Sequence, residues 1–192
     1  FLHVSLKRGE SISCESDAMV MMESHLDLTG RMQGGILNAL ARRLANGESF
    51  FQQHIQAVRG DGDCLLAPTL PGAIEVLEVG QVQYKISDGV YLASSDGVSV
   101  TAQMQSLGTA LLAGTGGFFI GQTAGRGQLA VNGFGALFTL EVSPNNPITI
   151  DNGPVVAWYS RLNYAISLST SQQNKGFLGT LVNRVLSSEG VV

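Results

Sequence analysis

Apolar residues along this chain occur in short runs, and turn-forming residues lie within a few positions of each run. The residues that favour these turns are Gly, Asp, Asn, Ser and Pro. Runs of this kind cover residues 18–22, 64–67, 90–93 and 129–131. A short apolar run bounded by turn signals is typical of a buried β-strand. The pattern predicts an all-β chain of many short strands.

The turns themselves have recognisable chemistry. Asp88-Gly89 and Asn152-Gly153 are dipeptides favoured in type I′ hairpins, because both central residues of that turn adopt positive φ. Gly60-Asp61-Gly62 and Gly125-Arg126-Gly127 are glycine-rich turns that lead into further apolar runs. These positions predict a hairpin near the beginning and near the end of each structural unit.

Two segments have a helical period instead. Apolar residues there share one face at a spacing of three or four, with polar residues elsewhere. The apolar positions are Ile36, Leu37, Leu40 and Leu44, and Phe177, Leu178, Leu181 and Val185. We therefore expect one or two short helices in an otherwise all-β domain. The related segment 107–117 contains too many glycines to hold a helix.

The same elements recur along the chain. Segment 35–51 aligns without a gap to segment 176–192, and residues 108–119 form a shorter, looser third relative. The identical pairs are Gly35/Gly176, Leu37/Leu178, Leu40/Leu181, Arg43/Arg184 and Glu48/Glu189. Upstream, the turn-and-strand segments 16–24, 87–95 and 151–160 correspond. The chain is thus predicted to hold three repeats, about 1–70, 71–141 and 142–192.

A unit of this size cannot cover its own sheet, so the three repeats should share one core. We expect a single domain over residues 1–192, sandwich-like or barrel-like, with pseudo-threefold internal symmetry. Phe51 and Phe119 are each followed by a strand, a glycine turn and a second strand, whereas the sequence stops at Val192. The third repeat is therefore expected to be truncated, with the source protein continuing beyond it.

Composition narrows the classes of function. The net charge is −4 and the sequence pI is about 5.3. Nucleic-acid binding depends on clustered Lys and Arg that displace counterions, so a nucleic-acid partner is not expected. Only two cysteines occur and no targeting segment is visible, which favours a cytoplasmic protein without a disulfide framework.

No charged side chain occurs between Gly97 and Gly125. Such a length would span a bilayer if it were helical, but its glycines favour buried strand and loop. Peripheral membrane contact stays open as an alternative. Uncharged, glycine-rich β faces such as residues 107–121 tend to be covered by a partner, so we expect a homo-oligomer. The identity of any other protein partner cannot be read from the sequence.

Nucleotide motifs are not supported. Residues 125–130 match G-x-G-x-x-A, but a dinucleotide site needs this motif between a strand and a helix, and Val131-Asn-Gly-Phe-Gly135 follows instead. None of Lys7, Lys85 and Lys175 has the spacing of a phosphate-binding loop. We therefore expect a turn at 125–127 and no cofactor.

Metal and nucleophile chemistry has little support either. His3, His25 and His54 are not spaced as zinc ligands, and no family signature surrounds Cys14 or Cys64. Strand alternation places His54 on the face opposite Ile55, which predicts exposure to solvent. The sequence predicts no metal site, no cofactor site and no catalytic residue.

Some repeated or distinctive residues have a structural and a functional interpretation. Glu48 and Glu189 are expected to accept turn N–H bonds, and Arg43 and Arg184 to pair locally with them, rather than to form an acid–base site. A second set consists of apolar and aromatic side chains at matching places in the first and third repeats. Its members are Met19, Met21, Met22, Trp158 and Tyr159. Core packing is the favoured interpretation for this set, with an adaptable binding surface as the alternative.

Several segments together resemble a known family. They are Phe1–Glu10, Gly47–Phe51, Leu66–Pro68 with Pro71-Gly72, Tyr91–Ser94, Asn132–Gly135 and Ile150–Gly153 with Val156–Trp158. The chain resembles the altered-inheritance-of-mitochondria (mitochondrial biogenesis) family and its prokaryotic relatives, over nearly its whole length. The resemblance implies a fold like that of the tryptophan RNA-binding attenuation protein. It transfers no catalytic residue, and RNA binding by the namesake of the fold is analogy only.

Two functions follow as hypotheses. The first is a non-enzymatic structural or interaction scaffold. This hypothesis is based on the absence of a recognisable set of catalytic residues in the sequence and on the family resemblance. Mitochondrial members of the family are linked to inner-membrane organisation, so the resemblance also implies peripheral membrane contact as an option. The second is a small-molecule-binding or RNA-binding protein of the attenuator type, which stands on the fold grouping alone.

Overall fold

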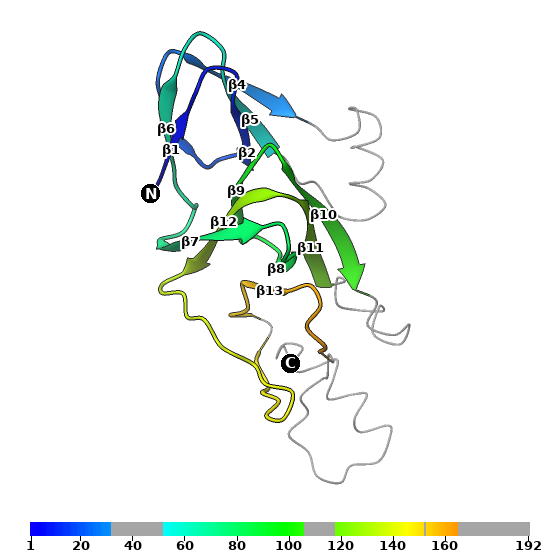
Figure 1. Ribbon diagram of the computed structural model, residues 1–192. Helices are drawn as coiled ribbons and strands as arrows, with labels where there is room; N and C mark the ends of the chain where they lie inside the picture. The colour runs from blue at the N-terminus through cyan, green and yellow to red at the C-terminus, as the bar shows by residue number, and fades with distance from the viewer. Residues whose placement is uncertain (32–51, 106–117, 152, 165–192) are drawn as a thin grey trace.

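The computed structural model describes residues 1–31, 52–105, 118–151 and 153–164. All regular structure in these residues is β (Figure 1). The strands are β1 (Leu2–Leu6), β2 (Ser11–Glu15), β3 (Met19–Met22), β4 (Leu26–Arg31), β5 (Gln52–Ala57), β6 (Gly62–Leu66), β7 (Gly72–Val79), β8 (Tyr84–Ser87), β9 (Tyr91–Ser95), β10 (Val98–Gln105), β11 (Phe118–Gly125), β12 (Gly127–Phe134) and β13 (Ala157–Tyr159). The all-β prediction is confirmed. The predicted helices and segment 107–117 lie outside the described residues.

The strands form three antiparallel sheets. One has the order β1-β6-β3, a second β10-β11-β8-β13, and the largest β4-β5-β2-β9-β12-β7. The largest sheet joins residues 1–70 to residues 71–141, because β2 pairs with β9 through Ser13 opposite Ser94.

Alternation of side chains explains why these segments are strands. In β2, Ile12 and Cys14 are buried while Ser11, Ser13 and Glu15 are partly exposed. In β6, the buried residues are Gly62, Cys64 and Leu66. Successive residues of a strand point to opposite faces, so every second side chain enters the core.

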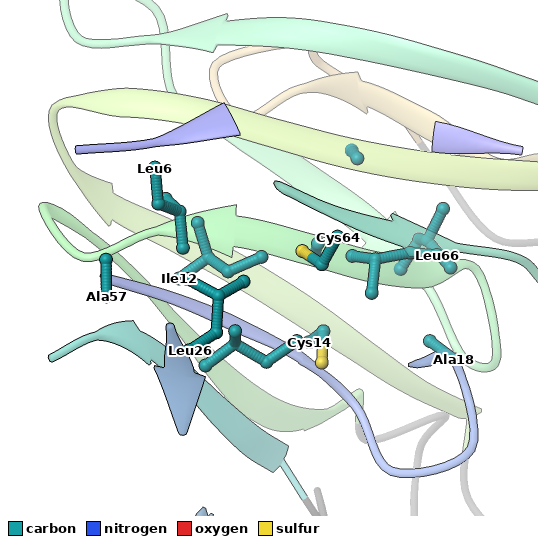
Figure 2. Close-up of a cluster of buried hydrophobic side chains, with 12 residues drawn as sticks. Leu6, Ile12, Cys14, Ala18, Leu26, Ala57, Cys64 and Leu66 are labelled. Atoms are coloured by element: carbon teal, nitrogen blue, oxygen red, sulfur yellow. The ribbon is translucent and has the colours of Figure 1, made fainter. Parts of the chain in front are cut away.

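The buried side chains form two cores. The first lies between β1-β6-β3 and the largest sheet, mostly its β4-β5-β2 half, and also includes Leu92 and Ala93 of β9 and Ala130 of β12. Figure 2 shows twelve of its residues. The second lies between the β7-β12-β9 half of the largest sheet and β10-β11-β8. Residues 1–70 and residues 71–141 thus each make a small sandwich of three strands on three strands. Removing this apolar surface from water is the main stabilising contribution, at about 25 cal/mol per Å².

Three of the four predicted hairpin turns are wrong, and the fourth, Asn152-Gly153, includes a residue outside the described ones. Asp88-Gly89 connects β8 to β9, and Gly125-Arg126-Gly127 connects β11 to β12, but in each case the two strands belong to different sheets. The same holds for the turn at Gly60–Gly62 between β5 and β6. The glycine chemistry was correctly recognised, since Gly89, Gly125 and Gly127 have φ of 73°, 96° and 146°. These turns are sheet-to-sheet corners, because the chain crosses the core instead of returning beside itself.

Strand pairing follows the same order in the two sandwiches. Residues 1–70 contain β1–β6, paired as β1-β6-β3 and β4-β5-β2. Residues 71–141 contain β7–β12, paired as β7-β12-β9 and β10-β11-β8. The third repeat, the shared threefold core and the single domain over 1–192 stay predictions, because much of 142–192 lies outside the described residues.

The strand registers also correct the sequence alignment by one residue. A bulge at Val20 in the pairing of β3 with β6 has its counterpart at Leu92 in the pairing of β9 with β12. Likewise β2 ends at Glu15 and β8 ends at Ser87. Glu15, and not Ser16, therefore matches Ser87. The dipeptide Ser-Asp occurs at 16–17 and at 87–88, one residue out of the structural register.

Candidate functional site

Aromatic side chains gather where β13 pairs with β8, two strands that lie far apart in the sequence. Tyr159 lies opposite Tyr84 in the register, and their rings meet edge to face with centroids 5.5 Å apart. Cross-strand aromatic pairs stabilise a sheet by about 0.2–1 kcal/mol. Burial, followed by the charge of Tyr159 and that of Glu78, raises the pKa of the Tyr84 hydroxyl. The phenol of Tyr84 therefore stays protonated near neutral pH.

Neighbouring residues of the same two strands form a cation–aromatic cluster with Tyr164. Trp158 lies opposite Lys85, and the Trp158 ring meets the Tyr164 ring edge to face at 5.7 Å. Lys85 Nζ lies 4.9 Å from the centroid of the Tyr164 ring and 3.3 Å from its hydroxyl oxygen. Cation–aromatic contacts of this kind are worth about 0.5–1 kcal/mol at exposed sites.

The Trp158 indole nitrogen is a candidate ligand-binding donor in this cluster. It is buried, and no hydrogen-bond partner for it occurs in the part of the chain that the structure describes. A buried donor without an acceptor costs about 1–3 kcal/mol. The Trp158 and Lys85 side chains both contact the Tyr164 ring, so this cluster holds two hydrogen-bond donor groups for an acceptor-bearing ligand, such as a carboxylate. We call Tyr84, Lys85, Trp158, Tyr159 and Tyr164 the aromatic cluster.

An exposed apolar surface extends from the end of β12 into the following segment. Four of its large apolar side chains are exposed, with the exposed Thr139 and Glu141 between them in the sequence. The four apolar residues are Phe134, Phe138, Leu140 and Val142, which we call the 134–142 surface. In Figure 1 this segment leaves the sheets below β7 and β12. Contiguous exposed apolar groups of this kind are typical of interaction sites.

The histidines do not come together. His3 forms an ion pair with Asp63 at 3.3 Å, and His25 Nδ1 lies 3.0 Å from the Asp61 carbonyl oxygen. A hydrogen bond from Ser5, followed by His3, lowers the pKa of the Asp63 carboxyl. His54 corrects the sequence prediction, because it is only 4% exposed. It faces away from Ile55 as expected, but β5 is an inner strand, with Ser13 and Thr29 on either side of His54.

The two cysteines are chemically quiet. Cys14 and Cys64 are free, fully buried and members of the first core (Figure 2). Burial, then the neighbouring Cys64 and Glu15, raises the pKa of Cys14 to about 12. Burial, then Asp63, raises the pKa of Cys64 to about 11. Thiolate is the reactive form, so both thiols are poor nucleophiles at neutral pH.

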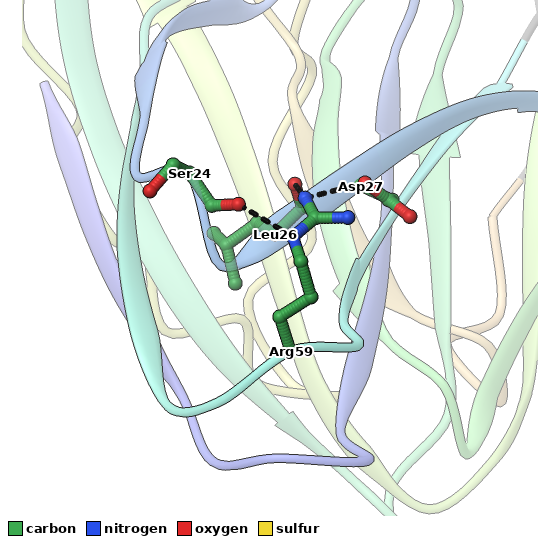
Figure 3. Close-up of polar contacts among 4 residues, drawn as sticks. All are labelled: Ser24, Leu26, Asp27 and Arg59. Carbon is green, nitrogen blue, oxygen red and sulfur yellow. Dashed lines mark hydrogen bonds and ion pairs between the residues drawn. The ribbon is translucent and has the colours of Figure 1, made fainter.

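A polar corner at the end of β5 was not predicted from the sequence. The Arg59 guanidinium donates hydrogen bonds to the carbonyl oxygens of Ser24 and Leu26, each at 2.8 Å, and contacts the Asp27 carboxylate at 2.6 Å (Figure 3). The corner holds the turn before β4 against the turn after β5. Its role is structural, since Arg59 Nε and Nη2 both bond within the protein.

The remaining candidates of the sequence analysis have mixed outcomes. Met19 and Met22 pack against the first core, as the core interpretation predicts, whereas Met21 and Tyr159 are exposed. Glu48, Glu189, Arg43 and Arg184 lie outside the described residues. Among the residues that are described, no group of three His, Cys, Asp or Glu side chains could hold a metal ion. No helix in that part of the chain has the length and apolar character needed to cross a membrane.

Comparison with known proteins settles the family. A family model described as mitochondrial biogenesis AIM24 matches residues 1–192. The chain belongs to the AIM24 family. The family resemblance that the sequence motifs suggested is thereby confirmed.

Relatives in the AIM24 family add a fold but no activity. An uncharacterised protein of Streptococcus pyogenes serotype M6 is 34% identical over 173 residues, which cover 87% of this chain and 69% of that protein. The crystal structure of a Streptococcus pyogenes protein has a TM-score of 0.75 at 31% sequence identity, over 98% of this chain and 80% of that chain. The aromatic cluster and the 134–142 surface therefore carry the functional argument.

Proposed function

We propose that this AIM24-family protein is a non-enzymatic interaction module that self-associates through the 134–142 surface. The observation that carries the proposal is the exposure of large apolar side chains there, with Phe134 at 79% and Phe138 at 85%. An aromatic side chain buries about 150–250 Å² when it is covered, which makes such residues the main contributors to interfaces.

A second copy of the chain fits this surface better than a membrane does. The net charge of −4 disfavours binding to anionic lipid headgroups, which attract clusters of Lys and Arg. A self-complementary apolar patch is instead what a twofold dimer requires. The buried thiols, with their raised pKa values, support a non-enzymatic role and a reducing compartment such as the cytoplasm.

Light scattering of the purified protein at micromolar concentration tests this proposal. The wild-type chain should have at least twice the monomer mass, and Phe138→Ser should shift it toward the monomer. Val82→Ser, at an exposed apolar residue far along the chain, is the matched control and should leave the mass unchanged. A monomeric wild-type protein would remove the proposal, as would binding to phosphatidylcholine vesicles in co-sedimentation that Phe138→Ser abolishes.

The aromatic cluster favours a second function, the binding of a small carboxylate ligand. Trp158 Nε1 and Lys85 Nζ supply an unused donor and a positive charge on neighbouring strands. This function corresponds to the small-molecule alternative that the attenuator-like fold suggested. An RNA ligand is disfavoured by the acidic composition of the chain.

Tryptophan fluorescence tests the second function directly, because Trp158 is the only tryptophan of the chain. Titration with succinate, acetate and benzoate should change the emission of the wild type, and Lys85→Met should weaken the response at least tenfold. Native mass spectrometry should show a co-purifying small molecule. No fluorescence response together with no co-purifying mass would exclude this function.

A further inference from the structure

In the part of the chain that the structure describes, one edge of the first sandwich lacks a strand that its counterparts have. β3 follows β2 in the chain as β9 follows β8, and β13 pairs with β8 in the register in which β9 pairs with β2. The strands β3, β9 and β13 are therefore equivalent. β9 pairs with β2, and β13 pairs with β8, whereas β6 is the one partner of β3 among the described residues. The missing neighbour of β3 is therefore a strand equivalent to β2 and β8.

The registers of the two existing pairs agree. Ile12 lies opposite Ser95 in the first pair, and Tyr84 lies opposite Tyr159 in the second. The sequence Ser87-Asp88-Gly89 after β8 corresponds to Asp151-Asn152-Gly153. The third equivalent of β2 and β8 is therefore the segment Ile148–Asp151, which precedes β13 as β8 precedes β9.

The exposed fractions show that the described residues bury neither the side chains of Ile148–Asp151 nor those of β3 completely. Ile148 is 43% exposed and Ile150 is 38% exposed, whereas Ile86 and Cys14, which match Ile150, are fully buried. On β3, Val20 is 53% and Met21 is 44% exposed. Their counterparts Leu92 and Ala93 on β9, which β2 covers, are 0% and 4% exposed.

We propose that Ile148–Asp151 adds to the free edge of β3 as an antiparallel strand of the same chain. Transfer of the β2–β9 register places Ile148 opposite Glu23, Thr149 opposite Met22 and Ile150 opposite Met21. The closed form buries Ile150 beside Met21, as Cys14 lies beside Ala93. It also satisfies backbone N–H and C=O groups that an open edge leaves to solvent.

The same chain is the favoured occupant for two reasons. The residues between Phe134 and Ile148 span up to ~3.3 Å each when extended, which is ample reach across a small domain. A tethered segment also has an effective concentration in the millimolar range, far above that of a second copy in dilute solution. The proposal concerns β3 and is independent of self-association through the 134–142 surface.

Disulfide trapping tests the register. In a Cys14→Ala/Cys64→Ala background, Thr149→Cys with Met22→Cys should form an intramolecular disulfide under mild oxidation, because directly opposed residues have Cβ atoms close enough to bridge. Thr149→Cys with Glu23→Cys is the matched control. Adjacent side chains of a strand point to opposite faces, so this pair should cross-link at least tenfold less.

The products separate the possible occupants. A monomeric disulfide-bonded species, read by non-reducing electrophoresis and mass spectrometry, supports the proposal. A covalent dimer would assign the edge to a second copy and overturn it, as would equal cross-linking of the control pair. Hydrogen exchange of the wild-type chain gives a measurement that needs no cysteine substitutions. The Glu23 amide already bonds to the Asp63 carbonyl oxygen of β6, so alternation points the Met22 amide to the opposite edge of β3. The Met22 amide should be protected, and Ile148→Asp/Ile150→Asp should abolish that protection while Glu23 stays protected. An unprotected wild-type Met22 amide would also overturn the proposal.

Discussion

Tyr91 donates a hydrogen bond from its hydroxyl to the carbonyl oxygen of Ser13, 3.0 Å away, and so ties β9 of the second sandwich to β2 of the first. The same hydroxyl lies 3.0 Å from Ser94 Oγ. Burial raises the pKa of Tyr91, which keeps the phenol protonated as a donor. The joint between the two sandwiches thus has a buried polar bond in addition to its strand pairing.

Loss of this bond should weaken the whole molecule. Tyr91→Phe removes only the hydroxyl, so we expect the free energy of unfolding to fall by about 1 kcal/mol. Urea unfolding followed by circular dichroism measures the change. Tyr159→Phe is the control, because that side chain is exposed and should change stability by less than about 0.5 kcal/mol. Equal effects of the two substitutions would mean that the Tyr91–Ser13 bond does not stabilise the joint.

Local patterns predicted the elements but not their partners. The apolar run at 129–131 and the glycines at 125 and 127 identified a strand and a turn correctly. Whether a turn returns the chain beside itself or carries it across a core depends on what the next strand packs against. Positive φ at Gly89 is compatible with either outcome. For that reason the corners were mistaken for hairpins.

The candidate site was only partly within reach of the sequence. Trp158 and Tyr159 were singled out as a possible binding surface, but Tyr84 and Lys85 lie more than seventy positions earlier and no short-range pattern links them. Arg59 bonds to the carbonyl oxygens of Ser24 and Leu26 in the same long-range manner. His54 shows a further limit of the sequence. Alternation predicts which face of the strand carries the His54 side chain, but it does not predict whether other residues bury that face.

The thiols should resist labelling in the folded protein. At pH 8 we expect neither Cys14 nor Cys64 to react with a thiol reagent such as DTNB within minutes, because both are buried and protonated. Both should react at once in 6 M guanidinium chloride. Rapid release of one equivalent of thionitrobenzoate from the native protein would show that a thiol is accessible, contrary to this structure.

Stability should fall at alkaline pH for the same reason. The folded-state pKa values of Cys14 and Cys64, about 12 and about 11, lie above the ordinary value of 9.0. Between these limits the unfolded chain loses thiol protons that the folded chain retains, so stability is full below about pH 8 and declines above about pH 9. Each thiol contributes a slope of up to about 1.4 kcal/mol per pH unit. Urea unfolding at pH 8, 9 and 10 should show a shallower decline for Cys14→Ala/Cys64→Ala, and equal slopes would refute the linkage.

Gly121 should not tolerate a side chain. A Cβ at this position of β11 would lie 2.7 Å from Ile86 Cγ1 and 2.9 Å from Val100 Cγ1, both in the second core. We expect Gly121→Ala to lower the free energy of unfolding by about 1–3 kcal/mol through overpacking. Gly80→Ala is the matched control, because its Cβ would meet Arg126 only at an ordinary 3.6 Å. A Gly121→Ala protein as stable as the control would mean that Ile86 and Val100 can move aside without cost.

At Arg59, the contribution of an ion pair to stability can be measured separately from the contribution of hydrogen bonds to the backbone. Arg59 and Asp27 are about half exposed, with side-chain exposures of 52% and 48%, so solvent screens their attraction. Exposed pairs of this kind contribute about 0.2–1 kcal/mol. The bonds from Arg59 to Ser24 and Leu26 survive removal of the carboxylate, but they are lost when the guanidinium is removed.

Arg59→Ala should therefore destabilise the protein more than Asp27→Ala does. We expect a loss of about 1.5–3 kcal/mol for the arginine, since charged donors to carbonyl groups are worth about that much, and under about 1 kcal/mol for the aspartate. A double-mutant cycle measured by urea unfolding should give a coupling below about 1 kcal/mol. Arg59→Lys keeps the charge but cannot place two N–H groups in the same fork, so it should recover only a part of the loss. Equal effects of Arg59→Ala and Asp27→Ala, with a coupling as large as either, would instead assign the stabilisation to the ion pair.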